Sequence, residues 1–350
     1  MLKSKSHSEP PGNYHGGLTE MGDNAEALIL SIDLGGTKIL TAVINAQGKI
    51  LSRDHSLTPP AKGQEAVIQA ILESAGRARN QAGIAAADIT AISIGAPGLS
   101  NPETGILFTS PNLPGWKNVP LLAIFERKFG KKVFLINDAN AAAIGELQFG
   151  AGKGARNLIY ITVSTGIGGG IIIDGKIYTG FIGTAGELGH MTIEVDGPLC
   201  NCGNRGCWES LASGTALARE ARQRINERAR TSLLDHAGGD PEKVSAEVIH
   251  QAAQAGDKLA AELITQTGYY LGVGLANLIN IFNPERIIIG GGLSNIGDRL
   301  LKPAFKEAER RAFKEAYRVV RFASPQLGQD SGVIGAAFLA LRGIAKRERE

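Results

Sequence analysis

The chain has 350 residues, of which 43% are hydrophobic and 20% are charged, and its formal net charge is +3. This length exceeds what one small core usually holds, so we expect two domains. The small net charge argues against a nucleic-acid or membrane partner bound by bulk electrostatics. All three cysteines fall between Cys200 and Cys207, which argues against a disulfide framework and favours a reducing, cytoplasmic compartment.

The first 26 residues are mostly polar and hold no apolar stretch of signal-peptide length. We therefore expect residues 1–26 to form a disordered tail. The apolar run Leu28 to Ile32 then predicts a short strand, and a second apolar run follows from Ile39 to Ile44. Between the two runs lies Asp33-Leu34-Gly35-Gly36-Thr37-Lys38, so this part of the chain predicts a strand–turn–strand hairpin.

Apolar residues at helical spacing predict a helix from Gln64 to Gln81. Two short apolar runs, Ala91 to Ile94 and Val133 to Ile136, predict buried strands. The second of these strands ends at Asn137-Asp138, and a helix is predicted from Ala139 to Phe149. A carboxylate therefore stands where a buried strand gives way to a helix.

The middle of the chain repeats the opening hairpin. Leu158 to Val163 predicts a strand, residues 164–170 predict a glycine-rich turn, and Ile171 to Ile173 predicts a returning strand. The repeat predicts two similar α/β domains that face each other across a cleft. A chance likeness between two glycine-rich turns is the alternative.

The C-terminal part predicts helices around one further strand. Two helical patterns occupy Glu247 to Phe282, and a buried strand at Arg286 to Ile289 runs into Gly290-Gly291-Gly292. A last amphipathic helix is predicted from Gly332 to Ala345. The apolar stretch Tyr269 to Phe282 is too short to span a membrane, and we expect a core helix there, with an interface helix as the alternative.

The two glycine turns have the chemistry of phosphate binding. Small residues between strands let backbone N–H groups approach an anion closely. Thr37 and Thr165 would add hydroxyl donors, Lys38 a positive charge, and Asp33 beside Gly35-Gly36 could hold a phosphate-bound Mg²⁺. For either turn alone, a tight hairpin without a ligand is the alternative.

Two common nucleotide-binding signatures do not occur in this sequence. No Gly-Lys pair is followed by Ser or Thr, so the phosphate loop of the Walker type is lacking. The run Gly166-Ile167-Gly168 lacks the third glycine of a dinucleotide fingerprint and leads into a strand rather than a helix. A dehydrogenase is therefore disfavoured.

Asp138 has two interpretations. As a helix N-cap it would accept hydrogen bonds from the amides of the following turn. As a general base it would stand at the carboxyl end of a strand, where open α/β sheets gather their ligands. The residues alone leave both interpretations open.

The pattern Cys200-x-Cys202-x4-Cys207, with His190 ten residues earlier, is more specific. Three thiols and one imidazole complete a tetrahedral zinc site, and glycines at 203 and 206 permit the sharp turns that such a site needs. Three buried cysteines that act as small hydrophobic residues are the alternative. Four protein ligands leave no open position, so the zinc would be structural.

Together these segments resemble the ROK family (repressors, open reading frames and kinases), and within it the bacterial glucokinases. The resemblance covers the chain from about Ala27 to its C-terminus. It rests on Asp33-Leu34-Gly35-Gly36-Thr37-Lys38, on Asn137-Asp138, on the run from Leu158 to His190, and on Cys200-x-Cys202-Gly203-x-x-Gly206-Cys207-x-Glu209.

The resemblance implies an α/β chain with the actin-like, two-domain fold of hexokinase-type ATPases, which is also ribonuclease H-like. ATP and sugar would meet in the interdomain cleft. A small α/β domain would comprise residues 27–138 and about 333–350, and a large α/β domain with the zinc motif would comprise residues 139–332.

The resemblance also implies the site residues and cofactors of a sugar kinase that uses ATP, Mg²⁺ and structural Zn²⁺. Asp138 matches the catalytic base. The sugar contacts match at Asn112, Asn137, Asp138, Glu187, His190 and Glu209. The ATP and phosphate contacts match at Asp33, Gly35, Gly36, Thr37, Lys38, Thr165, Gly166, Gly168, Gly290, Gly291 and Gly292. The zinc ligands match at His190, Cys200, Cys202 and Cys207.

The expected activity is phosphorylation of glucose at its 6-hydroxyl, by a homodimer. Another kinase of the family, acting on N-acetylmannosamine, N-acetylglucosamine, mannose or fructose, is the nearest alternative. A sugar-responsive repressor is more remote, because only some thirty residues without helical periodicity precede Asp33. One departure from many relatives is Ser100-Asn101, where an acidic residue is common.

Overall fold

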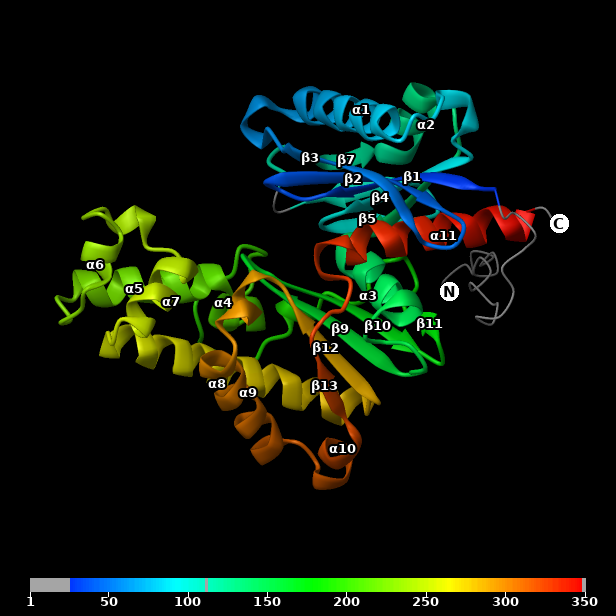
Figure 1. The fold of residues 1–350 in the computed structure, drawn as a ribbon. Coiled ribbons are helices and arrows are strands. Elements are labelled where there is room, and N and C mark those ends of the chain that lie inside the picture. Colours follow the sequence, from blue (N-terminus) through cyan, green and yellow to red (C-terminus); the bar gives the residue numbers. More distant parts are fainter. Residues whose placement is uncertain (1–25, 111–112, 348–350) are drawn as a thin grey trace, which may run out of the picture.

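The computed structural model describes residues 26–110 and 113–347 (Figure 1). The predicted tail, apart from Glu26, and the predicted sugar contact Asn112 fall outside the described residues. Two five-stranded sheets organise the rest of the chain. They lie one above the other in Figure 1, with two helices between them.

The first sheet has the strand order β3-β2-β1-β4-β8. β1 pairs antiparallel with β2 and parallel with β4, and β4 pairs parallel with β8. The strands that lie within the sheet are buried on both faces, which explains why their sequences are continuous apolar runs. The five strands are β1 Leu28–Leu34, β2 Lys38–Asn45, β3 Ile50–Leu57, β4 Ala91–Ala96 and β8 Val133–Asn137.

The second sheet repeats this arrangement in the order β11-β10-β9-β12-β13. Its hairpin is antiparallel and its later strands are parallel, as in the first sheet. The strands are β9 Leu158–Val163, β10 Ile167–Ile173, β11 Lys176–Ile177, β12 Arg286–Gly290 and β13 Arg321–Ala323. The predicted α/β class and the predicted duplication are both confirmed.

One predicted boundary in the second hairpin is wrong. The turn was expected over residues 164–170, but β10 already begins at Ile167. Three glycines therefore lie inside a strand rather than in the turn. Glycine suits these strand positions because neighbouring residues leave little room for a side chain. A Cβ on Gly170, for example, would lie 2.6 Å from the Cβ of Ala143.

The first sheet also carries elements that the sequence patterns did not predict. A three-stranded sheet follows β4, with the order β5-β6-β7. Its strands are β5 Leu99–Asn101, β6 Ile106–Thr109 and β7 Lys117–Pro120. The helices on this part of the chain are α1 Gln64–Gln81, at the predicted residues, and α2 Leu121–Phe129.

Helices cover the second sheet and extend from it as a lobe (Figure 1). Helix α8, Lys258–Phe282, is the longest of them, and its residues Leu271, Leu275 and Ile279 are fully buried, as a core helix requires. The others are α4 Trp208–Ala212, α5 Gly214–Asn226, α6 Leu233–His236, α7 Ala246–Gln254, α9 Asp298–Arg311 and α10 Lys314–Val319. Within the described ranges, no helix combines the length and apolar character that crossing a membrane requires.

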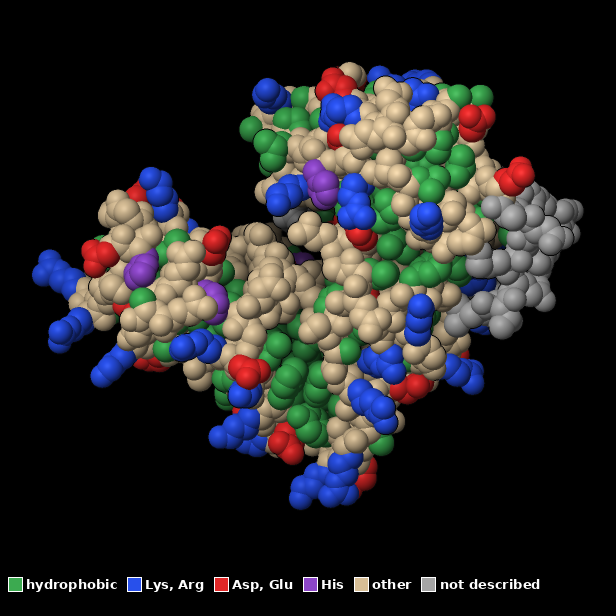
Figure 2. All heavy atoms as spheres, in the orientation of Figure 1, with side chains coloured by type: hydrophobic (Ala, Val, Ile, Leu, Met, Phe, Trp, Pro, Cys, Tyr) green, Lys and Arg blue, Asp and Glu red, His purple; other side chains and the backbone are tan. Residues whose placement is uncertain are grey.

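Two helices lie between the sheets, α3 Asp138–Phe149 and α11 Ser331–Arg347. Helix α3 packs against β9 and β10 of the second sheet, whereas α11 packs against β1 and β4 of the first. Short 3-10 turns complete the described structure at η1 Pro60–Lys62, η2 Ala86–Asp88, η3 Leu188–His190, η4 Pro241–Lys243, η5 Gly292–Ile296 and η6 Gly328–Asp330. The space-filling view shows a recess between the upper part of the molecule and the helical lobe (Figure 2).

Candidate active site

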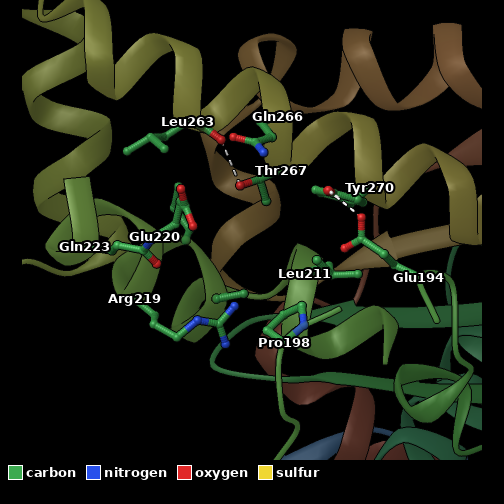
Figure 3. Close-up of a pocket in the computed structure, with 12 residues that line it drawn as sticks. Glu194, Pro198, Leu211, Arg219, Glu220, Gln223, Leu263, Gln266, Thr267 and Tyr270 are labelled. Atoms are coloured by element: carbon green, nitrogen blue, oxygen red, sulfur yellow. Dashed lines mark hydrogen bonds between the residues drawn. The ribbon is translucent and has the colours of Figure 1, made fainter. Parts of the chain in front are cut away.

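One pocket of about 200 Å³ lies within the helical lobe, between α5, α8 and the segment from Glu194 to Pro198 (Figure 3). Arg219, Gln223 and Tyr270 are among its lining residues. None of the residues predicted for sugar, phosphate or metal lines it. The predicted phosphate turns, the pair Asn137-Asp138 and the run Gly290-Gly291-Gly292 lie instead at the carboxyl ends of β1, β9, β8 and β12, where parallel sheets assemble ligand sites.

The first glycine turn joins β1 to β2 and is closed by hydrogen bonds. The amide of Gly35 donates to the carbonyl of Lys38 at 2.8 Å, and the hydroxyl of Thr58 donates to the carbonyl of Gly35 at 2.7 Å. A Cβ on Gly35 would lie 2.9 Å from the Lys38 carbonyl oxygen, so a side chain there would force the turn open. Thr37 and Lys38 are exposed beyond the turn, where an anion can reach them.

The second turn joins β9 to β10 and is held by the start of α5. Within the turn, the amide of Ser164 donates to the carbonyl of Gly166 at 2.9 Å. The hydroxyl of Thr215, in the first turn of α5, donates to the carbonyl of Thr165 at 2.8 Å. Thr215 therefore supports the predicted phosphate turn from a distant part of the sequence, and no local pattern marks it. Gly168 lies in β10 instead, where a Cβ would be 3.3 Å from the Cβ of Ala139.

The third glycine run lies directly against the second turn. Gly290 ends β12, and Gly291 has φ +89°, a conformation that favours glycine. A Cβ on Gly291 would lie 2.4 Å from the carbonyl oxygen of Val163, and one on Gly292 would lie 3.6 Å from the hydroxyl of Ser164. The predicted ATP contacts at Gly291 and Gly292 are thus neighbours of the second turn in space.

Asp33 and Asp138 approach each other across β4. A Cβ on Gly95 of β4 would lie 3.6 Å from Oδ1 of Asp33 and 3.8 Å from the Cα of Asp138. Burial raises the pKa of Asp33 to about 7, and the negative charge of Asp138 adds to this rise. Burial likewise raises the pKa of Asp138. Gly95 was not predicted as a site residue. Its position near the carboxyl end of a buried strand could have indicated it, because ligand sites form at such ends.

The N-cap of α3 is Asn137 and not Asp138. The side-chain oxygen of Asn137 accepts hydrogen bonds from the amides of Ala139 and Asn140, at 3.0 and 3.1 Å. The carboxylate of Asp138 accepts a hydrogen bond from the amide of Ala139, the next residue along, at 2.8 Å. Because another residue satisfies the helix terminus, the capping interpretation of Asp138 is wrong.

Two glutamates lie near this centre. Glu187 precedes η3, and burial raises its pKa; the charge of His190 lowers that pKa, whereas the charges of Asp138 and Glu209 raise it further. The charges of Asp138, His190 and Glu209 are thus close enough to act on the carboxyl of Glu187. Oε2 of Glu209 accepts a hydrogen bond from the amide of Ile167 at 2.8 Å, which ties this carboxylate to the second turn.

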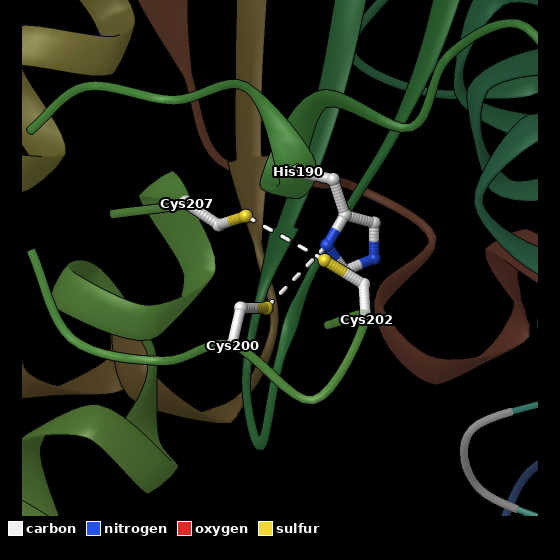
Figure 4. Close-up of side chains that lie close together, drawn as sticks. All are labelled: His190, Cys200, Cys202 and Cys207. Carbon is white, nitrogen blue, oxygen red and sulfur yellow. Dashed lines mark hydrogen bonds between the residues drawn. The ribbon is translucent and has the colours of Figure 1, made fainter. Parts of the chain in front are cut away.

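The predicted zinc ligands His190, Cys200, Cys202 and Cys207 converge, and their ligand atoms all lie within 4.8 Å of one another (Figure 4). Sγ of Cys200 lies 3.7 Å from Nδ1 of His190, and Sγ of Cys202 lies 3.6 Å from Sγ of Cys207. Zinc–sulfur bonds of about 2.3 Å at tetrahedral angles place ligand atoms roughly 3.8 Å apart. The four side chains therefore fit a tetrahedral zinc ion.

The protonation state of the thiols would depend on a bound cation. Burial, together with the two neighbouring thiols, raises the pKa of Cys207 to about 12, and burial raises the pKa of Cys200. Three thiolates this close would repel one another unless a positive ion lay between them. A cluster of neutral hydrophobic cysteines is hard to reconcile with Cys202, which is exposed.

The chain is similar to known proteins over most of its length. The sequence profile described as the ROK family matches residues 29–343. A glucokinase of Streptomyces coelicolor is 41% identical over 317 residues, covering 89% of this chain and 97% of that protein. A xylose repressor of Caldicellulosiruptor bescii is 32% identical over 313 residues, covering 89% of this chain and 78% of that protein.

Among solved structures, this chain resembles a ROK family glucokinase from Streptomyces griseus, crystallised with glucose and AMPPNP. The two share 38% identity with a TM-score of 0.79, and the match covers 89% of this chain and 99% of that one. The likeness confirms the predicted actin-like, two-domain fold.

Proposed function

The chain belongs to the ROK family and is a sugar kinase, and from that premise we propose that it transfers the γ-phosphoryl group of ATP to the 6-hydroxyl of glucose. The observation that carries the proposal is the proximity of Asp138 to Asp33 at Gly95, together with the effect of the Asp138 and Glu209 charges on Glu187. The proposed phosphate turn and the proposed acceptors of sugar hydroxyls would thus converge on the carboxylate of Asp138.

We propose that Asp138 is the general base. It would accept the proton of the sugar 6-hydroxyl while that oxygen attacks the γ-phosphorus in line, and the bond from the γ-phosphorus to the bridging oxygen of ADP would break. The raised pKa supports this role, because a base works best when its pKa lies near the operating pH. Asn137 holds the start of α3 in place, which fixes the direction of the neighbouring carboxylate.

We assign the phosphates of ATP to the two glycine turns and the adenosine to the run Gly290-Gly291-Gly292. Amides and hydroxyls of residues 36–38 and 164–166, other than the Ser164 amide that closes its turn, would bind the phosphate oxygens as they gain charge. A Mg²⁺ ion would supply further positive charge there, and Asp33 is the residue that we propose to hold it. The proximity of Gly292 to Ser164 supports this assignment.

We propose that Asn137, Glu187, His190 and Glu209 bind the sugar hydroxyls. A neutral sugar offers no charge to recognise, so selectivity must come from several hydrogen bonds, and carboxylates accept them well. Oε2 of Glu209 accepts a hydrogen bond from the amide of Ile167, and we propose that Oε1 accepts one from a sugar hydroxyl. The side-chain oxygen of Asn137 accepts at the helix cap and its NH₂ group donates to the carbonyl of Gly98 at 3.4 Å, so we expect it to offer its second amide hydrogen to the sugar.

We propose a structural zinc ion at His190 and the three cysteines. Zinc would neutralise the thiolates and fix the imidazole ring through Nδ1, the atom that faces Cys200. Nε2 would then remain free for a sugar hydroxyl. The zinc site would thus hold one wall of the sugar site rigid without entering the chemistry.

We also propose the domain boundaries expected from the sequence, residues 27–138 with about 333–350 and residues 139–332, because α11 packs on the first sheet and α3 on the second.

A homodimer is consistent with the exposed apolar side chains of Ile281 and Phe313, which are 65% and 70% exposed. A cytoplasmic location would keep the thiols reduced. Light scattering in solution tests the dimer.

A kinase for another hexose or for an N-acetylated amino sugar is the second candidate, because the same wall of carboxylates could bind any of these sugars. The product separates the two candidates. After incubation with glucose and MgATP, phosphorus NMR should show glucose 6-phosphate, and glucose-6-phosphate dehydrogenase should oxidise the product. Failure to form it under conditions where another sugar is phosphorylated would overturn the proposal.

A further inference from the structure

The chain passes between the two sheets twice, and the two passages touch. Helix α3 leads from β8 of the first sheet to the second, and the segment before α11 leads back from β13. The helices meet at two glycines: a Cβ on Gly335 would lie 1.8 Å from the carbonyl oxygen of Ala141, and one on Gly145 would lie 2.3 Å from the carbonyl oxygen of Ser331. The backbones are therefore in direct contact at this crossing (Figure 1).

One carboxylate binds both passages at this point. Glu146 of α3 is 0% exposed. Its Oε2 accepts hydrogen bonds from the amides of Ala151 and Gln326, at 2.8 and 3.0 Å. Its Oε1 accepts from the amide of Leu327 at 2.9 Å and from the hydroxyl of Ser331 at 2.8 Å. Both oxygens are thus used, and three of the four donors belong to the returning passage.

Each passage leads to an active-site carboxylate. Asp138 is the first residue of α3, about two helical turns before Glu146. On the other passage, Ser331 is followed by Gly332, where a Cβ would lie 2.9 Å from Oδ2 of Asp33. Glu146 therefore joins the helix that carries Asp138 to the helix start that packs against Asp33.

Stability alone does not account for a carboxylate at this position. Burying a carboxylate costs free energy that its hydrogen bonds must offset, and well-packed apolar residues often stabilise a core as well. The four hydrogen bonds that converge on Glu146 also fix the relative positions of the chain segments that donate them. Phosphoryl transfer is sensitive to such fixing, since its rate depends chiefly on position and electrostatics.

We propose that Glu146 is a positioning residue for phosphoryl transfer, which sets the spacing between Asp138 and Asp33 by joining the two passages between the sheets. Glu146 does not touch sugar or nucleotide in this account. The proposal rests on the role of Asp138 proposed above, and it predicts a loss of turnover rather than of sugar binding.

The test is Glu146→Gln, with Ser331→Ala as a milder second variant. Glutamine keeps the volume but turns its NH₂ group toward amide donors, so two hydrogen bonds are replaced by repulsion. Asp257→Asn is the matched control, because the carboxylate of Asp257, in the helical lobe, likewise accepts four hydrogen bonds. Two come from the amides of Ala260 and Ser232, and two from the hydroxyls of Thr231 and Ser232.

Glucose affinity is measured by calorimetry, and kcat is measured per sugar-binding molecule well below the melting temperature. We expect Glu146→Gln to keep the glucose Kd within about threefold while kcat falls at least about tenfold, the effect of a small misplacement of reacting groups. Ser331→Ala should lower kcat less, and Asp257→Asn should lower the melting temperature while kcat stays within about twofold.

Turnover of folded Glu146→Gln within twofold of the control would overturn the proposal, as would equal losses of kcat in Glu146→Gln and Asp257→Asn. If Glu146→Gln does not fold, unchanged kcat in Ser331→Ala overturns it. All variants are assayed on the sugar that the unmodified enzyme turns over best. A different best sugar would therefore refute the glucose proposal while the ratio between variants still decides the role of Glu146.

Discussion

Nε2 of His190 lies 4.0 Å from Oε2 of Glu187, while Nδ1 of the same ring faces Sγ of Cys200 at 3.7 Å. One imidazole therefore joins the cysteine cluster to the proposed sugar wall. A metal bound at Nδ1 would fix both the tautomer and the orientation of the ring. This arrangement gives a structural metal a direct consequence for sugar binding.

Loss of the metal should therefore weaken the fold and the sugar site together. We expect Cys202→Ser to lower the melting temperature and to raise the glucose Kd at least about tenfold, the usual scale for disrupting a metal site. Calorimetry and thermal unfolding, with zinc content measured by mass spectrometry, check this result. Cys202 is exposed, so the substitution itself leaves no buried cavity.

Asn204→Ala is the control for that variant. It removes the hydrogen bond from Nδ2 of Asn204 to the hydroxyl of Thr192, at 3.0 Å in the same loop, but leaves all four ligands. Zinc content and glucose affinity should stay unchanged. A zinc-free Cys202→Ser protein that binds glucose normally would refute the link between metal and sugar.

Replacing Asp138 with Asn should separate binding from chemistry. The amide keeps the volume and can still hydrogen-bond a hydroxyl, so we expect the glucose Kd to change by less than about fivefold. It cannot accept the proton, so kcat should fall at least about a hundredfold. Turnover comparable to that of the unmodified enzyme would remove Asp138 from the role of base.

The raised pKa values predict loss of activity on the acid side of neutrality. Burial brings the pKa of Asp33 to about 7 and also raises that of Asp138. Both carboxyls must be ionised in the proposed mechanism, so protonation removes activity and kcat/KM should fall as the pH drops through about 7. A pH profile of kcat/KM checks this expectation. A profile that stays flat down to about pH 5, where ordinary carboxyls are still ionised, would contradict it.

Gly166→Ala should disturb the sugar wall through a steric contact. A Cβ on Gly166 would lie 2.2 Å from Oε2 of Glu209, so the carboxylate must move and lose its hydrogen bond from the amide of Ile167. A hydrogen bond to a charged group contributes about 1.5–3 kcal/mol, so glucose affinity should fall at least about tenfold. Calorimetric titration with glucose measures the change.

Gly76→Ala is the matched control, because Gly76 lies inside α1 and a Cβ there would meet nothing within 4 Å. We expect this variant to bind glucose normally and to gain about 0.5–1 kcal/mol of stability from helix propensity. Equal glucose affinities in the two variants would show that Glu209 does not depend on the second turn.

The local patterns predicted much of this fold, because hairpins and buried strands depend on residues that are close together in the sequence. The duplicated hairpins followed from two similar runs, and the cysteine spacing predicted a cluster that the structure brings together. Relations between distant segments could not be predicted in this way. Asp33 and Asp138 approach each other at Gly95 although they end different strands, and the hydrogen bonds of Glu146 reach residues about 180 positions away.

Local chemistry also left some choices open until neighbouring side chains were placed. Asn137 and Asp138 are both good N-caps, and only the observed hydrogen bonds assign the cap to Asn137. The start of β10 was misplaced because glycine runs are typical of turns, whereas here they admit the close packing of α3.

The central claim is that this kinase acts on glucose, and a comparison of kcat/KM over a panel of sugars tests it most directly. ADP release from MgATP is followed with glucose, mannose, fructose, N-acetylglucosamine and N-acetylmannosamine, with Asp138→Asn as the blank. The account predicts the highest kcat/KM for glucose, at least about tenfold above either N-acetylated sugar. An N-acetylated sugar that matches or exceeds glucose, or glucose turnover no greater than the blank, would contradict the account.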